Sequence, residues 1–147
     1  MKGMLMGLLA GLIVALALGF AAYVRFAPSD PARWHVDPSG FYAWDHGGGW
    51  GEVIARMDGA ILRLPAQEGG LERLDAIAMA TPRSTRLAGS VAEGRITWVI
   101  RSALWGFPDY ITAQQTEDGI YIDSRLRFGK SDLGVNAKRL QLWLEQL

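Results

Sequence analysis

The sequence predicts an α+β domain attached to a single transmembrane helix, with a four-stranded antiparallel meander covered by one helix before it and one after it. Three observations lead to this prediction. An apolar run, Met4–Val24, stands at the N-terminus, and helical periodicity precedes and follows the central region. The central region consists of strands joined by connections of about three residues. Because such short connections join only antiparallel neighbours, the strands form a meander whose apolar face must be covered by helices.

The run Met4–Val24 is long enough to cross a membrane as one helix. A helix rises about 1.5 Å per residue, so 21 residues reach the roughly 30 Å of a bilayer's hydrocarbon core. Lys2 and Arg25 flank the run, and aromatic residues cluster at its far end, at Phe20, Tyr23 and Phe26. We therefore predict an uncleaved anchor over residues 1–25. The alternative is a cleaved signal peptide, since small-residue triplets suited to cleavage lie at 15–17 and 19–21.

Small residues recur every four positions in this segment, at Gly3, Gly7, Gly11, Ala15 and Gly19. Such a stripe allows two helices to approach closely, which predicts a homodimer contact, although glycine and alanine are also common in membrane spans. Positive charges at the two ends of the span nearly balance. The short N-terminal tail favours a domain outside the cytoplasm, so we predict the inner membrane with a periplasmic domain.

Composition excludes several classes of function. The chain has 15 basic and 15 acidic residues, so no net field draws it to nucleic acid. It has no cysteine, which excludes disulfides, thiolate zinc sites and cysteine nucleophiles. The roughly 120 residues after the anchor make one small domain with a single core.

Residues 26–58 are expected to form an extended tether followed by an irregular loop. Three prolines, Pro28, Pro31 and Pro38, break regular structure, and glycines alternate with aromatic residues over 39–51. The globular domain is expected to occupy residues 59–147.

The elements of that domain follow from periodicity. Ala60–Leu64 is a candidate short strand, and a helix with Leu71 and Leu74 on its apolar face ends before Pro82. Four strands are then predicted, at Arg86–Val91, Arg95–Trp105, Tyr110–Thr116 and Ile120–Phe128. In the second of these, one face is apolar and carries Ile96, Trp98, Ile100 and Leu104.

The last helix is predicted from about Leu133 to Leu147, with Ser131 or Asp132 as its N-cap. One stripe of it is apolar, at Leu133, Ala137, Leu140, Leu144 and Leu147. A second stripe carries Asp132, Asn136, Arg139 and Trp143. An ordered polar series of this kind indicates side chains held against the sheet.

Two segments form a recognisable pattern: Gly106-Phe107-Pro108-Asp109, and the run from Ser124 to Arg139 with Ser-Asp-Leu-Gly-x-Asn at its centre. Over residues 65–147 the pattern resembles the C-terminal signature of the domain of unknown function 1499 family. Asp123 and Leu126 depart from that signature, and the matching positions are Asp109, Ser124, Arg127, Gly129, Ser131, Asp132, Leu133, Gly134, Asn136 and Arg139. The resemblance implies an uncharacterised protein of bacteria or plastids, often beside a membrane segment. It implies no activity.

The candidate ligand site is a set of cations near the start of the last helix, where free N–H groups favour an anion. Its residues are Arg101, Arg127, Lys130, Ser131, Asn136 and Arg139. The alternative is an internal network in which acids and amides already satisfy these arginines and join helix to sheet. Asp109, Asp132, Gly129 and Gly134 are assigned to that network.

No catalytic, metal or cofactor residue is assigned. The segment Gly129-Lys130-Ser131 lacks the earlier glycine of a phosphate-binding loop, and His35, Asp37, Asp45 and His46 lack a metal-ligand spacing. The sequence therefore favours a membrane-tethered, non-enzymatic binding or scaffold module with an anion patch. The alternative is a hydrolase-like or transferase-like enzyme that uses Asp132, Asn136 and Arg139 with Asp109.

Overall fold

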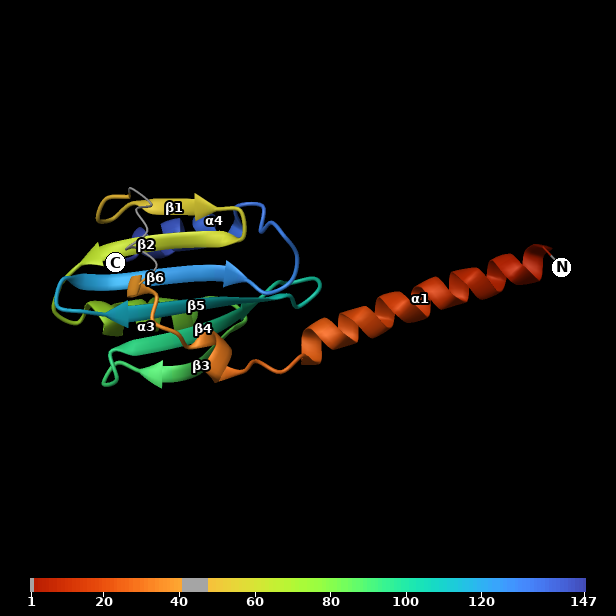
Figure 1. Cartoon of the computed structure of the whole chain (residues 1–147), viewed down its shortest axis with the longest axis horizontal. Coiled ribbons are helices and arrows are strands. Elements are labelled where there is room, and N and C mark those ends of the chain that lie inside the picture. The colour runs from red at the N-terminus through yellow and green to blue at the C-terminus, as the bar shows by residue number, and fades with distance from the viewer. Residues whose placement is uncertain (1, 41–47) are drawn as a thin grey trace.

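The computed structural model describes residues 2–40 and 48–147 of the chain. Helix α1 (Lys2–Phe26) projects from a domain in which helices lie on one face of a sheet (Figure 1). The further elements are α2 (Pro31–Trp34), β1 (Val53–Arg56), β2 (Gly59–Pro65), α3 (Gly70–Ala80), β3 (Ser84–Ser90), β4 (Arg95–Arg101), β5 (Pro108–Gln115), β6 (Gly119–Leu126) and α4 (Val135–Leu144).

The sheet is antiparallel throughout, with the strand order β1-β2-β6-β5-β4-β3. The predicted α+β class, the N-terminal apolar helix and the antiparallel sheet are confirmed. The predicted count of four strands is wrong, because the sheet has six. Strands β3 to β6 form the expected meander, and the β1–β2 hairpin extends it by pairing β2 with β6. That pairing joins segments far apart in the chain, with Ala60 opposite Ser124, so short connections give no sign of it.

Helices α3 and α4 cover one face of the sheet and form the main core with it (Figure 1). At its centre the rings of Trp98 and Trp143 meet edge to face, with centroids 5.9 Å apart. Both indole N–H groups are satisfied although both rings are buried. Trp98 donates to Asp75 and Trp143 to the Thr81 hydroxyl, each at 2.9 Å. This is the arrangement that buried tryptophans require.

The opposite face is covered in part by the chain that follows α1. The Trp34 ring stacks on Tyr110 with centroids 3.8 Å apart and an angle of 7° between the planes. Trp34 is the last residue of helix α2. The Asp30 carboxylate caps the start of this helix by accepting the N–H of Ala32 at 2.9 Å. The Trp34 carbonyl accepts a bond from the buried Thr112 hydroxyl at 3.1 Å. Residues that the sequence placed in a tether therefore lie against the sheet.

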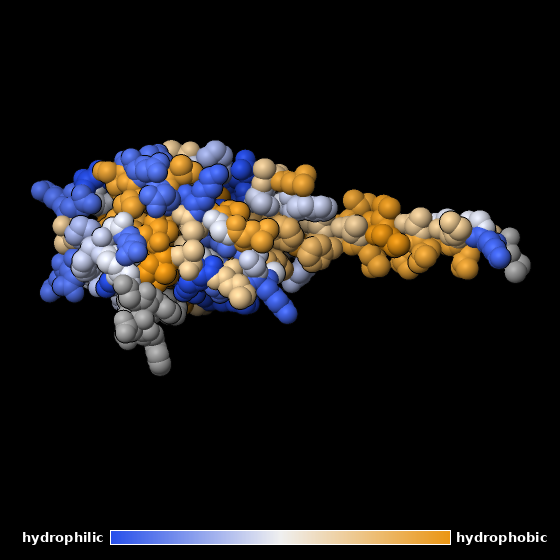
Figure 2. Space-filling view, turned by 90° about the horizontal axis from the view of Figure 1, so that it is seen from above, coloured by the Kyte–Doolittle hydropathy of each residue, from blue (hydrophilic) through white to orange (hydrophobic). Residues whose placement is uncertain are grey.

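Helix α1 leaves the end of the sheet where β4 meets β5 (Figure 1). Its apolar surface is exposed along its length (Figure 2), and it is long and apolar enough to cross a membrane, as a signal sequence also is. Its last turns contact the domain. Phe20 packs on Phe107 with ring centroids 6.3 Å apart, Tyr23 packs on Phe128 at 5.8 Å, and Val24 is buried.

Candidate functional site

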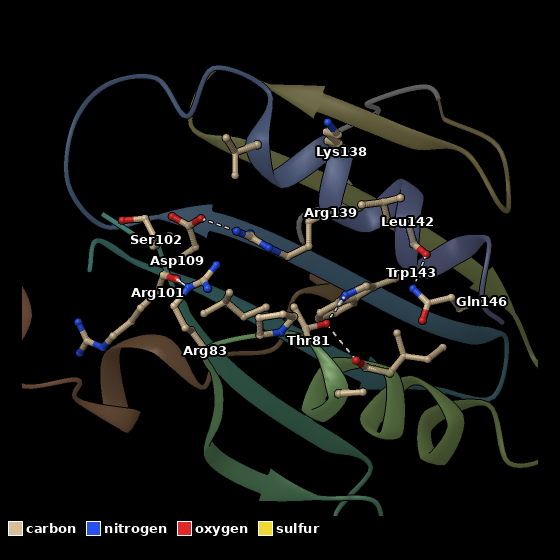
Figure 3. Close-up of a pocket in the computed structure, with 16 residues that line it drawn as sticks. Thr81, Arg83, Arg101, Ser102, Asp109, Lys138, Arg139, Leu142, Trp143 and Gln146 are labelled. Atoms are coloured by element: carbon tan, nitrogen blue, oxygen red, sulfur yellow. Dashed lines mark hydrogen bonds and ion pairs between the residues drawn. The ribbon is translucent and has the colours of Figure 1, made fainter. Parts of the chain in front are cut away.

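A cleft of about 540 Å³ lies between the end of α3, the end of β4 and the outer side of α4 (Figure 3). We call it the α3/α4 cleft. Its apolar wall is formed by Ile77, Ile100, Leu142 and Trp143. Its polar lining comes from Thr81, Arg83, Arg101, Ser102, Asp109, Lys138, Arg139 and Gln146. The arrangement therefore combines an apolar surface with a rim rich in cations.

Arg139 links α4 to the sheet at the edge of this cleft. Its guanidinium donates to Asp109 of β5 at 3.0 Å and to the Asn136 amide oxygen, which also accepts a bond from Ser124 of β6. The side chains of Arg139 and Asp109 are 13% and 15% exposed, and Asn136 is fully buried. The second stripe of α4 thus contacts the sheet through a polar network, because the helical repeat places positions 136, 139 and 143 on one side.

The ionisation of Asp109 reflects two opposed effects. Burial raises the pKa of this carboxyl, and the Arg139 guanidinium lowers it again without cancelling the effect of burial. The Asn136 amide nitrogen is itself buried and has no hydrogen-bond partner in the described chain. The network is thus satisfied at the arginine and incomplete at the amide.

The turn before α4 explains several residues of the predicted signature. Leu133 and Gly134 adopt left-handed backbone conformations, with φ of 54° and 79°. The Asp132 carboxylate accepts the N–H groups of Gly134 and Asn136, each at 2.9 Å. The Asp132 carboxylate thus accepts hydrogen bonds at the start of α4, as a capping side chain does, although the N-cap residue itself is Gly134. The start of α4 therefore already has an anion of its own.

The structure separates the predicted anion ligands. Arg127 lies on the opposite face of the sheet, where it donates to the Pro28 carbonyl at 2.7 Å and to the Tyr110 hydroxyl at 3.1 Å. Arg101 donates to the Gly106 carbonyl at 2.9 Å, and its side chain points away from Arg139 (Figure 3). Lys130 is exposed on the loop before α4.

Two further predicted residues, Gly129 and Ser131, lie in the same loop before α4. The Ser131 hydroxyl accepts the N–H of Leu133 at 3.2 Å. Gly129 has a φ of 101°, a conformation that residues with a Cβ rarely adopt. Of the predicted ligand residues, Arg139 and Asn136 alone are brought together in one network, together with Asp109 from the predicted structural set.

Two cations of the cleft were not among the predicted site residues. Arg83 and Lys138 are both exposed, and within the described chain neither has a carboxylate within 4.0 Å. Arg83 has a φ of 61° and donates its Nε–H to the Arg101 carbonyl at 2.9 Å, which holds it over the cleft. Lys138 precedes Arg139 on α4, and only the position of α3 makes this side of the helix a wall of the cleft.

A second charged cluster lies on the opposite face. Asp123 of β6 is 3% exposed and contacts Arg56 at 2.5 Å and Arg125 at 3.6 Å. Burial raises the pKa of Asp123, and both arginines lower it in part. Arg125 also lies over the Trp34 ring, 5.1 Å from its centroid. In the sequence Asp123 is distinguished only as a departure from the family pattern, since a single acid in a strand gives no sign of burial.

Of the histidines and aspartates considered for metal binding, His35 and Asp37 lie in the described chain, and each contacts another side chain of the domain. His35 Nδ1 lies 2.9 Å from the Thr97 hydroxyl, and Asp37 contacts Arg95 at 3.4 Å. Asp45 and His46 lie outside the described residues. Within residues 2–40 and 48–147, no group of three or more histidine, aspartate or glutamate residues is placed to hold a metal ion.

A family model described as a protein of unknown function (DUF1499) matches residues 56–147. The chain belongs to this family. The match runs from the end of β1 through α4, so it contains the cleft, the Arg139 network and the turn before α4, and it leaves out α1 and α2. No curated protein and no solved structure matches the chain. The family description assigns no activity, so a function has to be argued from the site.

Proposed function

We propose that this chain is a membrane-anchored, non-enzymatic binding module, and that the α3/α4 cleft holds a ligand with an anionic group and an apolar portion. The observation that carries the proposal is the charge of the cleft. Arg83, Arg101, Lys138 and Arg139 line it, and Asp109 is the single acid among its described lining residues. Asp109 is already paired with Arg139, and Arg101 points away from Arg139 and donates to the Gly106 carbonyl, so Arg83 and Lys138 remain as exposed cations without a counter-charge in the described chain.

The cations have different roles in this proposal. Arg139 is held on both sides by Asp109 and Asn136, so it positions the rim and is not free to turn towards a ligand. Arg83 and Lys138 are exposed and lie on opposite sides of the cleft (Figure 3), so the proposal assigns the anion contacts to them. A guanidinium and an ammonium together suit a phosphate or carboxylate group, which accepts charge-assisted hydrogen bonds from both.

The apolar wall suits the rest of such a ligand. Ile77, Ile100, Leu142 and Trp143 present hydrocarbon beside the cations, and the volume of about 540 Å³ lies within the range of small-molecule sites. Leu142 is 49% exposed, so a ligand that covers it removes apolar surface from water. A short-chain alkyl phosphate or carboxylate therefore matches the cleft better than a bare inorganic anion does.

The anchoring part of the proposal is supported by contacts of α1 with the domain. Val24 is 1% exposed, and Arg101 donates to its carbonyl at 3.4 Å. A segment removed after export would leave these contacts unmade, so they favour an uncleaved anchor over residues 1–25. The proposal places this anchor in the inner membrane and the domain in the periplasm. The predicted tether over 26–58 is not kept as a separate part, because Trp34 of α2 stacks on Tyr110 and β1 pairs with β2 of the predicted domain over 59–147.

The predicted homodimer contact stays part of the proposal. A Cβ added at Gly3, Gly7, Gly11 or Gly19 would meet nothing within 4 Å, so the chain itself does not use this stripe. The open stripe is available to a second copy of α1 in the membrane.

Thermal unfolding of the full chain in a neutral detergent tests the ligand. Hexyl phosphate is expected to raise the melting temperature by roughly 5 °C at ten times its Kd, and inorganic phosphate and hexanol by less. The double variant Arg83→Ala/Lys138→Ala should lose this rise while melting like the wild type without ligand. Arg33→Ala removes an exposed cation from the opposite face and serves as the matched control.

An equal shift in the double variant would refute the cleft as the site. Release of inorganic phosphate from hexyl phosphate would instead support the alternative of an enzyme built on Asp132, Asn136, Arg139 and Asp109.

A further inference from the structure

We infer that the β4–β5 connection, Ser102–Phe107, inserts into the interfacial layer of the bilayer that α1 crosses, so that the domain contacts the membrane at a second point. The inference rests on the proposed anchoring by α1. Its starting observation is a pair of exposed apolar side chains in this connection, Leu104 at 78% and Trp105 at 50% exposure. Apolar surface continues from α1 onto the adjoining end of the domain (Figure 2).

The depth of the connection follows from its contact with α1. The hydrocarbon core needs about 20 residues of helix, so a span that begins at Met4 ends near Tyr23. Phe20 then lies about 5 Å inside that boundary, at about 1.5 Å per residue. Since the ring of Phe107 packs on Phe20 with centroids 6.3 Å apart, Phe107 lies within that distance of the same depth, which places it close to the boundary of the hydrocarbon core. The domain cannot keep this contact without bringing the connection into the membrane interface.

The side chains of the connection suit that layer. Leu104 and Trp105 form a shallow groove with Ala21, Ala22 and Arg25 of α1. Tryptophan is favoured at the headgroup level because its ring is apolar and its N–H is polar, and an arginine there extends its charge towards the headgroups. In water the side chains of Leu104 and Trp105 would stay exposed, whereas insertion into the interface would bury both.

Several backbone polar groups of the connection are also satisfied by hydrogen bonds within the protein, which suits an environment with little water. Two backbone hydrogen bonds close the turn: the Ser102 N–H donates to the Phe107 carbonyl at 2.9 Å, and the Gly106 N–H donates to the Ser102 carbonyl at 3.1 Å. The Ser102 hydroxyl accepts the N–H of Phe107 at 3.0 Å, and Arg101 donates to the Gly106 carbonyl. Internal bonds of this kind reduce the cost of leaving water.

The consequence concerns the α3/α4 cleft. Ser102 and Ala103 belong to both the connection and the cleft lining, so an inserted connection places one wall of the cleft at the level of the lipid headgroups. A ligand with an anionic group and an apolar portion would then reach the cleft from the bilayer side.

Because the chain has no cysteine, single probes can be placed at will. The full chain carrying Leu104→Cys is labelled with an environment-sensitive dye and reconstituted in vesicles of phosphatidylcholine and phosphatidylglycerol. We expect blue-shifted emission, quenching by lipids brominated on the acyl chain, and protection from aqueous iodide. Glu117→Cys, in the exposed connection at the opposite end of β5, is the matched control and should show none of these.

A Leu12→Cys probe in the middle of α1 separates the two parts of the inference. Quenching of the Leu12 probe by brominated lipid together with an iodide-accessible Leu104 probe would overturn the insertion alone. An unquenched Leu12 probe would overturn the anchoring and the insertion together. Protection of the Leu104 probe without lipid quenching would assign its cover to a second copy of the chain and also overturn the membrane contact.

Discussion

Removal of the Arg139 guanidinium tests whether the polar stripe of α4 holds the fold together. In Arg139→Ala the Asp109 carboxylate loses its partner at 3.0 Å and the Asn136 oxygen loses one of its two donors. Breaking a fully buried pair in this way costs roughly 3–5 kcal/mol. Because the two side chains are still 13% and 15% exposed, solvent screens part of the lost attraction, and we expect a cost of roughly 2–4 kcal/mol.

Urea unfolding of the full chain in neutral detergent, followed by tryptophan fluorescence, measures this cost. For a domain of this size the expected loss lowers the urea midpoint by about 1–2 M with an unchanged slope. Lys138→Ala is the matched control, since it removes the neighbouring cation of the same helix, which is exposed and unpaired in the described chain. It should change the free energy of unfolding by less than about 0.5 kcal/mol.

The double variant Arg139→Met/Asp109→Asn decides whether the lost stability comes from the pair. This variant removes both charges together. Its loss in free energy of unfolding should therefore be smaller, by about 1–3 kcal/mol, than the sum of the losses in the two single variants. An unchanged midpoint in Arg139→Ala, or strict additivity in the cycle, would refute the argument that this pair joins α4 to β5.

Two further predictions concern the opposite face of the sheet. Because burial raises the pKa of Asp123 above its ordinary 3.8, the folded chain binds that proton more tightly than the unfolded chain does, and the free energy of unfolding falls as pH rises from 3.8 through the folded pKa. Asp123→Asn should remove this part of the slope in urea midpoints measured from low pH to about pH 7, and an identical slope in the variant would contradict the assignment. Trp34→Ala deletes a 6%-exposed ring stacked on Tyr110 and should cost about 3–4 kcal/mol. Trp34→Phe should keep most of that stability, and equal midpoints for the two variants would show that the stack contributes nothing.

Sequence reasoning located the elements whose pattern is local. The order of polar residues at positions 132, 136 and 139 indicated that this side of the last helix meets the sheet, and Arg139 and Asn136 do contact Asp109 and Ser124 there. Leu133, placed in the apolar stripe, is instead 91% exposed, because the left-handed turn starts the helix two residues later. A helical wheel assumes a regular backbone and cannot include such a turn.

The predicted anion site shows the opposite case. Arg101 ends β4, Arg127 follows β6 and Arg139 lies within α4. Arg127 contacts the Pro28 carbonyl on one face of the sheet, whereas Arg139 contacts Asp109 of β5 on the other. Side chains alternate between the two faces of a strand, so the face that each arginine shares with its neighbours depends on register. Arg83 and Lys138, which line the cleft, belong to segments whose meeting depends on where α3 crosses the sheet.

The sequence by itself determined the apolar N-terminal helix, the α+β class, the meander from β3 to β6 and the family, because each of these depends on composition, periodicity or spacing within one stretch of chain. Only the tertiary structure decided that the β1–β2 hairpin extends the sheet beside β6, that the chain after α1 covers the second face, and that the free cations gather between α3 and α4. Those features are contacts between distant segments. Their free energy comes from burial and pairing that exist only once the sheet has formed.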